Sequence, residues 1–179
     1  MEKRALRVGL VADTHVPNSL PRLPSSLRMA LAGVDRILHA GDLTTLAVLD
    51  QLEEIAPTTA VLGNCDAPEV ARRLSSYETL SIGEHTIGVH HGHQRHALQN
   101  QYIGSSYAAP AFDLFYQAMA TQLPTCDVIV FGHFHAPVVR EWRGILFVNP
   151  GSIAPPHARP TYAVLEIAER ATARLCLLP

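Results

Sequence analysis

The chain has 179 residues, of which 47% are hydrophobic and 17% are charged, and its formal net charge is −2. This size and composition predict one globular domain spanning residues 1–179. The nearly balanced charge gives no electrostatic case for binding nucleic acid or an anionic membrane. Ten histidines are scattered along the sequence, which excludes an affinity tag. Because histidine is the commonest metal ligand, this surplus is the first functional signal.

Cysteine usage and hydropathy favour a soluble protein of the reducing cytoplasm. The three cysteines (65, 126 and 176) form no C-x-x-C pair, and their odd number argues against a disulfide framework. The apolar run at residues 8–12 is too short for a signal sequence. No apolar stretch approaches the roughly 18 residues of a membrane span.

The first half of the chain alternates predicted strands and helices. Apolar runs predict strands at residues 6–12, 36–40 and 59–62, with a helix at 25–32 between the first two. A second helix is expected to start at Thr44 and to end before Pro57. This alternation favours parallel strands in a buried sheet.

Strands dominate the rest of the sequence. Residues 77–82 and 85–90 predict a hairpin around Gly83-Glu84, residues 94–110 a loop, and residues 111–123 a helix that buries Phe112, Phe115 and Met119. Five further strands are expected at 127–131, 138–142, 145–148, 161–167 and 173–178. The short spacings favour antiparallel pairing in this last third.

Polar residues follow six of the predicted strands. In α/β sheets, ligands bind at the carboxyl ends of strands, so these segments are expected to converge. Counting the candidate metal ligands gives seven residues: Asp13, His15, Asp42, Asn64, His91, His133 and His135. Carboxylate, amide and imidazole groups suit manganese, iron or zinc. Seven ligands exceed one tetrahedral site and fit two ions that share a carboxylate, an arrangement suited to phosphoester displacement.

Taken in order, five segments resemble those of the calcineurin-like metallophosphoesterase superfamily. They are Asp13-Thr14-His15, Gly41-Asp42, Gly63-Asn64-Cys65-Asp66, His91-Gly92-His93 and Gly132-His133-Phe134-His135. The short length, the Gly63-Asn64-Cys65-Asp66 form and Asn149-Pro150-Gly151-Ser152 are similar to its small prokaryotic phosphodiesterase branch. The resemblance runs from Val8 to about Ile167. It implies an α/β (α+β) fold, a four-layer αββα sandwich of two mixed β-sheets flanked by helices.

The resemblance also implies a role for each site residue. Asp13, His15 and His135 fall on a first metal ion, Asn64, His91 and His133 on a second, and Asp42 on the bridging position. His93 matches a position near the bound phosphate. Two divalent ions are implied, with Mn²⁺ preferred and Fe, Ni or Zn also compatible. The expected catalytic residues are Asp42, Asn64, His93 and Cys65.

The chain departs from the family pattern at three places, one of which, Phe134 in place of a frequent threonine, is not at a ligand position and should leave the metals unaffected. Cys65 stands where many members carry a histidine, and either a weak phosphate contact or a small buried structural residue fits it. Arg159 and His157 lie where related enzymes often place an arginine, so their roles stay open. Asp66 and His39 could orient Asn64 or the bridging group, or make plain structural hydrogen bonds.

The function expected from these residues is a dinuclear-metal phosphodiesterase, in which a metal-bridging hydroxide attacks phosphorus in line with the leaving group. A phosphomonoesterase or nucleotidase could use the same site. A protein-binding scaffold is the alternative from another class, because the superfamily's retromer subunit works in assembly. That lineage lacks part of the ligand set, whereas all seven positions are filled here. The expected partners are a small phosphodiester or nucleotide substrate and a second copy of the chain, with no membrane. The net charge disfavours nucleic acid, although a nuclease that uses the same metals stays open, because single-stranded ends could enter an open site.

Overall fold

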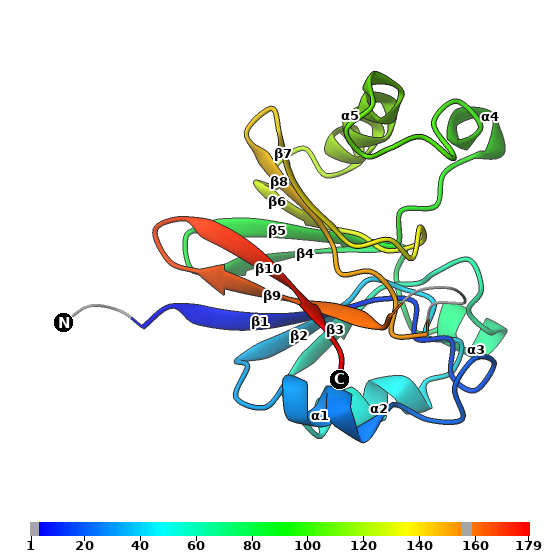
Figure 1. The fold of residues 1–179 in the computed structure, drawn as a ribbon, viewed down its shortest axis with the longest axis vertical. Coiled ribbons are helices and arrows are strands. Elements are labelled where there is room, and N and C mark those ends of the chain that lie inside the picture. The colour runs from blue at the N-terminus through cyan, green and yellow to red at the C-terminus, as the bar shows by residue number, and fades with distance from the viewer. Residues whose placement is uncertain (1–3, 155–158) are drawn as a thin grey trace.

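The computed structural model describes residues 4–154 and 159–179. Two five-stranded sheets face each other, with α1 (Ser25–Ala30) and α2 (Ala47–Glu53) outside the first and α5 (Asp113–Gln122) outside the second (Figure 1). The predicted four-layer sandwich of two mixed sheets is therefore confirmed.

The first sheet has the strand order β10-β9-β1-β2-β3. Three strands run parallel, namely β1 (Leu6–Val11), β2 (Arg36–His39) and β3 (Thr58–Ala60). The other two, β9 (Thr161–Ile167) and β10 (Ala171–Leu177), continue the sheet antiparallel. The parallel pairing expected for the first half of the chain is confirmed.

The second sheet has the order β4-β5-β6-β8-β7. Its strands are β4 (Tyr77–Ile82), β5 (His85–His90), β6 (Val128–Val130), β7 (Val138–Trp142) and β8 (Ile145–Asn149). The pairs β4/β5 and β7/β8 are antiparallel, but β6 is parallel to both of its neighbours. The purely antiparallel expectation for the last third is thus wrong at β6. The hairpin of β7 and β8 places β7 at the sheet edge and returns β8 beside β6.

Three apolar layers hold the sandwich together. Buried aliphatic side chains such as Val8, Leu38 and Val89 fill the space between the sheets. Val48, Leu49 and Leu52 of α2 pack on the outer face of the first sheet, at the helical spacing that the sequence shows. The apolar face predicted for residues 111–123 is confirmed, because Phe112, just before α5, and Phe115 and Met119 of α5 are all buried in an aromatic layer on the second sheet.

Local structure differs from the expectations at three places. The helix expected from Thr44 begins at Ala47, because Thr44 has a φ of 68° and donates its backbone N–H to Asp66. The segment expected as a loop at 94–110 contains α4 (His96–Gln99) and leads into a short 3₁₀ helix, η1 (Pro110–Phe112). The short helix α3 (Pro68–Ala71) was not expected. Helices of four residues carry too few apolar positions to show a period.

The topology brings the two sheets' parallel strands to a common end. Asp13 follows β1, Asp42 follows β2 and Asn64 follows β3, while His91 follows β5 and His133 follows β6. Hydrogen bonds join the sheets here, since the His91 Nδ1 atom lies 2.8 Å from the carbonyl oxygen of Ala40.

Candidate metal centre

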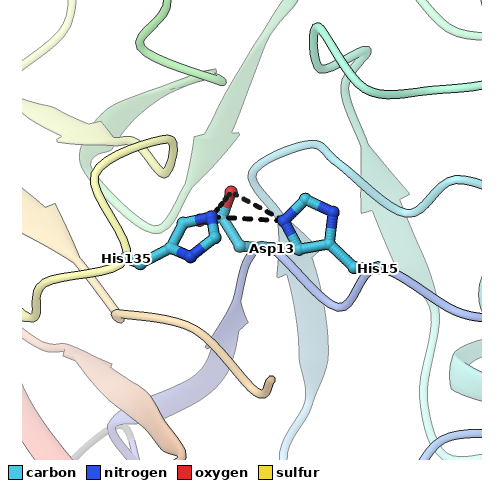
Figure 2. A group of neighbouring side chains, drawn as sticks. All are labelled: Asp13, His15 and His135. Atoms are coloured by element: carbon cyan, nitrogen blue, oxygen red, sulfur yellow. Dashed lines mark hydrogen bonds and ion pairs between the residues drawn. The ribbon is translucent and has the colours of Figure 1, made fainter. Parts of the chain in front are cut away.

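The seven residues expected from the sequence as metal ligands lie at this common end. Asp13, His15 and His135 form one group and point toward one another (Figure 2). The Nε2 atoms of His15 and His135 are 3.2 Å apart, and the Nε2 atom of His135 is 3.4 Å from Oδ1 of Asp13. A cation placed among these atoms would face two imidazole nitrogens and one carboxylate oxygen.

A second group lies beside the first. The Nε2 atom of His91 is 3.3 Å from Asp42 Oδ2 and 3.1 Å from Asn64 Oδ1. The His133 ring is 5.2 Å from the His91 ring, measured between centroids. Asp42 connects the two groups, because its Oδ2 atom is also 3.8 Å from Nε2 of His15.

The backbone is strained at the residues that carry these side chains. Positive φ angles between 47° and 72° occur at five of the expected ligands, namely Asp13, His15, Asp42, His133 and His135. Residues other than glycine rarely adopt this left-handed conformation, which costs on the order of 1–3 kcal/mol each. Such strain clusters at functional sites, where the surrounding structure enforces it.

Glycine makes room for the central carboxylate. A Cβ atom added to Gly63 would lie 2.1 Å from Oδ1 of Asp42, and one added to Gly132 would lie 2.9 Å from Oδ2 of Asp13. Only glycine therefore allows the loops after β3 and β6 to approach the carboxylates this closely.

Electrostatics favour an ionised Asp42 beside polar neighbours. Burial disfavours the charged carboxylate, but hydrogen bonds with His91 and with the backbone N–H of Cys65 outweigh it and hold the pKa of Asp42 well below its usual range. Burial lowers the pKa of His91, but its contact with Asp42 raises it more, so the net shift is upward. The Asp13 carboxylate likewise raises the pKa of His135.

The pKa of His133 shifts in the opposite direction from those of His91 and His135. Burial, together with the neighbouring imidazoles of His91 and His93, lowers the pKa of His133 to about 4. The ring is therefore neutral at pH 7 and has one lone pair to offer, as a metal ligand must.

These observations fit a binding site for divalent cations. The convergent donor atoms are imidazole nitrogens and carboxylate and amide oxygens, the set that suits manganese, iron and zinc. Two imidazole nitrogens facing each other at 3.2 Å need a proton or a cation between their lone pairs.

His93 lies at the edge of the second group. Its ring centroid is 5.5 Å from that of His91, and it also stacks on the buried His90 at 5.7 Å. The Nδ1 atom of His93 is buried and has no hydrogen-bond partner among the described residues. Burial lowers the pKa of His93, which favours the neutral form of the ring.

Cys65 is exposed, so its interpretation as a small buried residue is wrong. Partial desolvation and the charge of Asp42 raise the pKa of the Cys65 thiol to about 11. Its backbone N–H donates to Oδ1 of Asp42 at 2.8 Å. The main chain of Cys65 thus orients Asp42, while the thiol stays protonated at neutral pH.

His39 and Asp66 make hydrogen bonds with the loops around the site and not with the side chains of Asn64 or Asp42. His39 is fully buried, with Nε2 at 3.2 Å from Thr14 Oγ1 and Nδ1 accepting the Gly41 N–H. Asp66 accepts the backbone N–H groups of Thr44 and Gly63 at 2.6 and 2.7 Å. Both therefore support the structural alternative more directly than contact with Asn64 or Asp42.

Two other expected contributors have different outcomes. His157 lies outside the described residues. Arg159 is exposed.

A cavity of about 490 Å³ adjoins His15 and His135, and its remaining lining is Ser19, Leu20, Ile153, Ala154 and Pro160.

Sequence reasoning missed Gln99, whose Oε1 atom is 3.3 Å from Nε2 of His133. It lies at the end of α4, in the segment without a clear period. Glutamine is common on surfaces, so no signal in one sequence could single it out. Ser152 also reaches the site, donating its hydroxyl to the carbonyl oxygen of Asp13 at 2.8 Å.

Comparison with known proteins agrees with this geometry. A family model described as "Calcineurin-like phosphoesterase superfamily domain" matches residues 6–170. A probable metallophosphoesterase of Methanothermobacter thermautotrophicus is 31% identical over 164 residues, covering 89% of this chain and 85% of the relative. A phosphodiesterase of Methanocaldococcus jannaschii is 23% identical over 159 residues, covering 82% and 83% of the two chains. In fold, the chain is similar to vacuolar protein sorting 29 of Cryptosporidium parvum, with a TM-score of 0.73, 24% identity, and coverage of 97% and 98%.

Proposed function

Because the chain belongs to the calcineurin-like phosphoesterase superfamily, we propose that it is a metal-dependent phosphodiesterase. The observation that carries this proposal is the convergence of Asp13, His15, Asp42, Asn64, His91, His133 and His135 at one end of both sheets. A structural polar cluster would not need five of these residues in strained backbone conformations.

The proposed ligand assignment follows the two groups. Asp13, His15 and His135 hold one divalent ion, and Asn64, His91 and His133 hold the other. Asp42 belongs to both, since its Oδ2 atom lies within 4 Å of a histidine nitrogen from each group. Mn²⁺ is the proposed ion, with Fe, Ni or Zn as alternatives that the same ligands suit.

Two divalent cations bound here would supply Lewis-acid activation of the attacking water and neutralise charge on the phosphoryl oxygens. The protein itself holds the two carboxylates, Asp42 and Asp13, in position for the ions. The Cys65 and Gly63 loop fixes Asp42, and the N–H of His133 fixes Asp13 through a bond of 3.0 Å to its Oδ2 atom. A neutral His93 can donate one ring N–H to a phosphate oxygen.

The chain's residues favour substrates with good leaving groups. Cys65 replaces the family's frequent histidine, and its raised pKa makes it a weak proton donor. Without a strong general acid, the leaving oxygen must depart as an anion that is already stable. The apolar lining of the 490 Å³ cavity, formed mainly by Leu20, Ile153 and Pro160, fits an organic substituent on the phosphate.

A phosphomonoesterase or nucleotidase would use the same residues, and it is the second candidate. The likeness in fold to vacuolar protein sorting 29 motivates a third, a protein-binding scaffold. The complete ligand set favours catalysis over the scaffold, because a scaffold has no need of seven convergent donors.

The proposed substrate is a small phosphodiester or a nucleotide. With a net charge of −2, the protein has no overall attraction to nucleic acid. We place its action in the cytoplasm, with a homodimer as the proposed assembly. Within the described residues, no helix has both the length and the apolar character that crossing a membrane requires.

The deciding experiment compares hydrolysis of a bis-aryl phosphodiester with that of an aryl phosphomonoester. The protein is first stripped with a chelator, and each substrate is then assayed with and without added Mn²⁺. Metal-stimulated turnover with a diester-to-monoester ratio above one is expected. A ratio below one would favour the monoesterase, and no stimulated turnover of either substrate would favour the scaffold.

A further inference from the structure

The side chain of Gln99 reaches the candidate metal centre from outside the two sheets. Gln99 is the last residue of α4, and its Oε1 atom is 3.3 Å from Nε2 of His133. Both side chains are partly buried. None of the segments that resemble the family contains this glutamine.

The hydrogen bonds around Gln99 determine which of its amide atoms faces His133. The backbone N–H of Gln94 lies 3.4 Å from the same Oε1 atom. A backbone N–H can only donate, so the amide atom that it meets must be the carbonyl oxygen. A carbonyl oxygen can only accept, and His133 must therefore donate through Nε2. A neutral imidazole has a single N–H, which leaves the lone pair of His133 on Nδ1.

His91 shows the same principle with the nitrogens exchanged. Its Nδ1 atom lies 2.8 Å from the carbonyl oxygen of Ala40, so Nδ1 carries the proton. Its Nε2 atom faces the oxygen atoms of Asp42 and Asn64, so Nε2 is the ring nitrogen that a cation beside Asp42 would meet. In both histidines, a carbonyl oxygen thus engages one ring nitrogen, and only the other is available to a cation.

Gln99 is held in place by the aromatic layer that also supports the loop of His133. The backbone N–H of Tyr102 donates to the carbonyl oxygen of Gln99 at 3.1 Å, and the Tyr102 side chain is fully buried. The Tyr102 ring lies 6.3 Å from that of Phe134, the residue between His133 and His135. The acceptor and the histidine are thus fixed against one common core.

We propose that Gln99 is a positioning residue, which holds His133 in its Nε2-protonated tautomer and so reserves Nδ1 as a metal ligand. Loss of such a partner typically weakens metal binding about 10–100-fold. The expected loss of metal affinity rests on the proposed function, whereas the tautomer of His133 does not.

The test uses three variants of the full chain. Gln99→Leu removes the acceptor, and Gln99→Glu keeps an acceptor at the same position. Gln101→Leu is the matched control, because Gln101 is exposed on the same segment and its amide donates to the carbonyl oxygen of Ala97. Two-bond ¹H–¹⁵N spectra of the metal-free proteins report the tautomer of each histidine, with His133 assigned by the loss of its signals in His133→Gln.

The wild type, Gln99→Glu and Gln101→Leu are expected to show the Nε2–H pattern for His133. Gln99→Leu should lose that preference. In Mn²⁺ titrations, the more weakly bound of the two ions should bind to Gln99→Leu at least about tenfold less tightly than to the wild type. Gln99→Glu should restore the wild-type affinity.

Two results would overturn the proposal. One is an Nδ1–H tautomer of His133 in the wild type, a result that does not depend on any variant folding. The other is unchanged tautomer and Mn²⁺ affinity in a folded Gln99→Leu protein. If the wild type bound no Mn²⁺ but Gln99→Leu still changed the tautomer, the positioning of His133 would be supported and the proposed enzymatic function contradicted.

Discussion

The Nε2 atom of His91 lies 3.3 Å from Oδ2 of Asp42, and the two residues come from different sheets. His91 follows β5 of the second sheet, and Asp42 follows β2 of the first. The contact therefore measures how closely the two sheets meet at the candidate site. It also makes Asp42 the residue on which both groups of proposed ligands depend.

Replacing Asp42 with alanine should remove binding of both proposed ions. The carboxylate contacts a histidine from each group, so no ligand set remains complete without it. We expect phosphodiester hydrolysis to fall by more than about a hundredfold. Bound metal is measured by elemental analysis after dialysis against Mn²⁺. Asp50→Ala, at an exposed position of α2, is the control and should retain both metal and activity. Full metal content in Asp42→Ala would contradict the bridging assignment.

Replacing Cys65 with alanine should change activity much less. The thiol is protonated at neutral pH because its pKa is about 11, and the contact with Asp42 uses the main chain, which alanine keeps. We expect less than about a tenfold loss in kcat for the aryl diester, below the 10²–10⁴-fold that a general acid contributes. Steady-state kinetics measure this. A complete loss would show that the side chain takes part in the reaction.

Adding one methyl group at Gly63 should damage the site. The new Cβ atom would lie 2.1 Å from Oδ1 of Asp42, so Gly63→Ala must displace the carboxylate or the loop after β3. We expect weaker Mn²⁺ binding, measured by titration calorimetry, together with a lower urea midpoint. Gly144→Ala is the matched control, because its φ of 80° makes alanine strained while nothing lies within 4 Å of the added atom. It should cost about 1 kcal/mol in stability and leave Mn²⁺ affinity unchanged. Equal affinity in both variants would contradict the role of Gly63.

The metal-free protein should lose stability as the pH falls below about 6.5. Burial lowers the pKa of His39 to about 3, with a further contribution from the charge of His91. The unfolded chain binds a proton near pH 6.5 and the folded chain does not, so stability is full above pH 6.5 and is lost as the pH falls toward 3. Between pH 7 and 4.5 this one group should cost about 2–3 kcal/mol.

Urea unfolding in a chelator at pH 7 and at pH 4.5 measures this loss. His39→Asn keeps an acceptor for the Gly41 N–H and does not titrate, so its stability should depend less on pH than that of the wild type. His96→Asn is the control, since His96 is exposed on α4. An identical pH dependence in His39→Asn and wild type would show that His39 is not responsible.

The sequence alone predicts much of this molecule because its chemistry lies at strand ends. Short apolar runs mark β1, β2, β5 and β6, and the residues that follow each run include the proposed ligands. The hairpin of β4 and β5 was predicted with the bounds that the structure shows. The antiparallel pairing expected around β6 was wrong, since the pairing partner of a short buried strand depends on distant segments.

The residues around the histidines also show what the sequence predicts and what it leaves out. The period-two alternation of a strand separates His91 from His90, whose ring is buried and stacks on His93. It does not reveal Gln99, because the contact with His133 joins residues 34 positions apart through a four-residue helix. Nor does it reveal that Cys65 acts on Asp42 through its backbone N–H, a group that every residue except proline has.

The order of ligand-type residues, each placed after an apolar run, was determined by the sequence itself, because local composition specifies a strand and the turn that ends it. Which carbonyl oxygen faces a ring nitrogen of His133 or His91 was decided only by the tertiary structure. Hydrogen-bond partners such as Gln99 Oε1 and the Ala40 carbonyl oxygen come from elements far apart in the chain. Their positions follow from the packing of two sheets and an aromatic layer, and no local pattern encodes that packing.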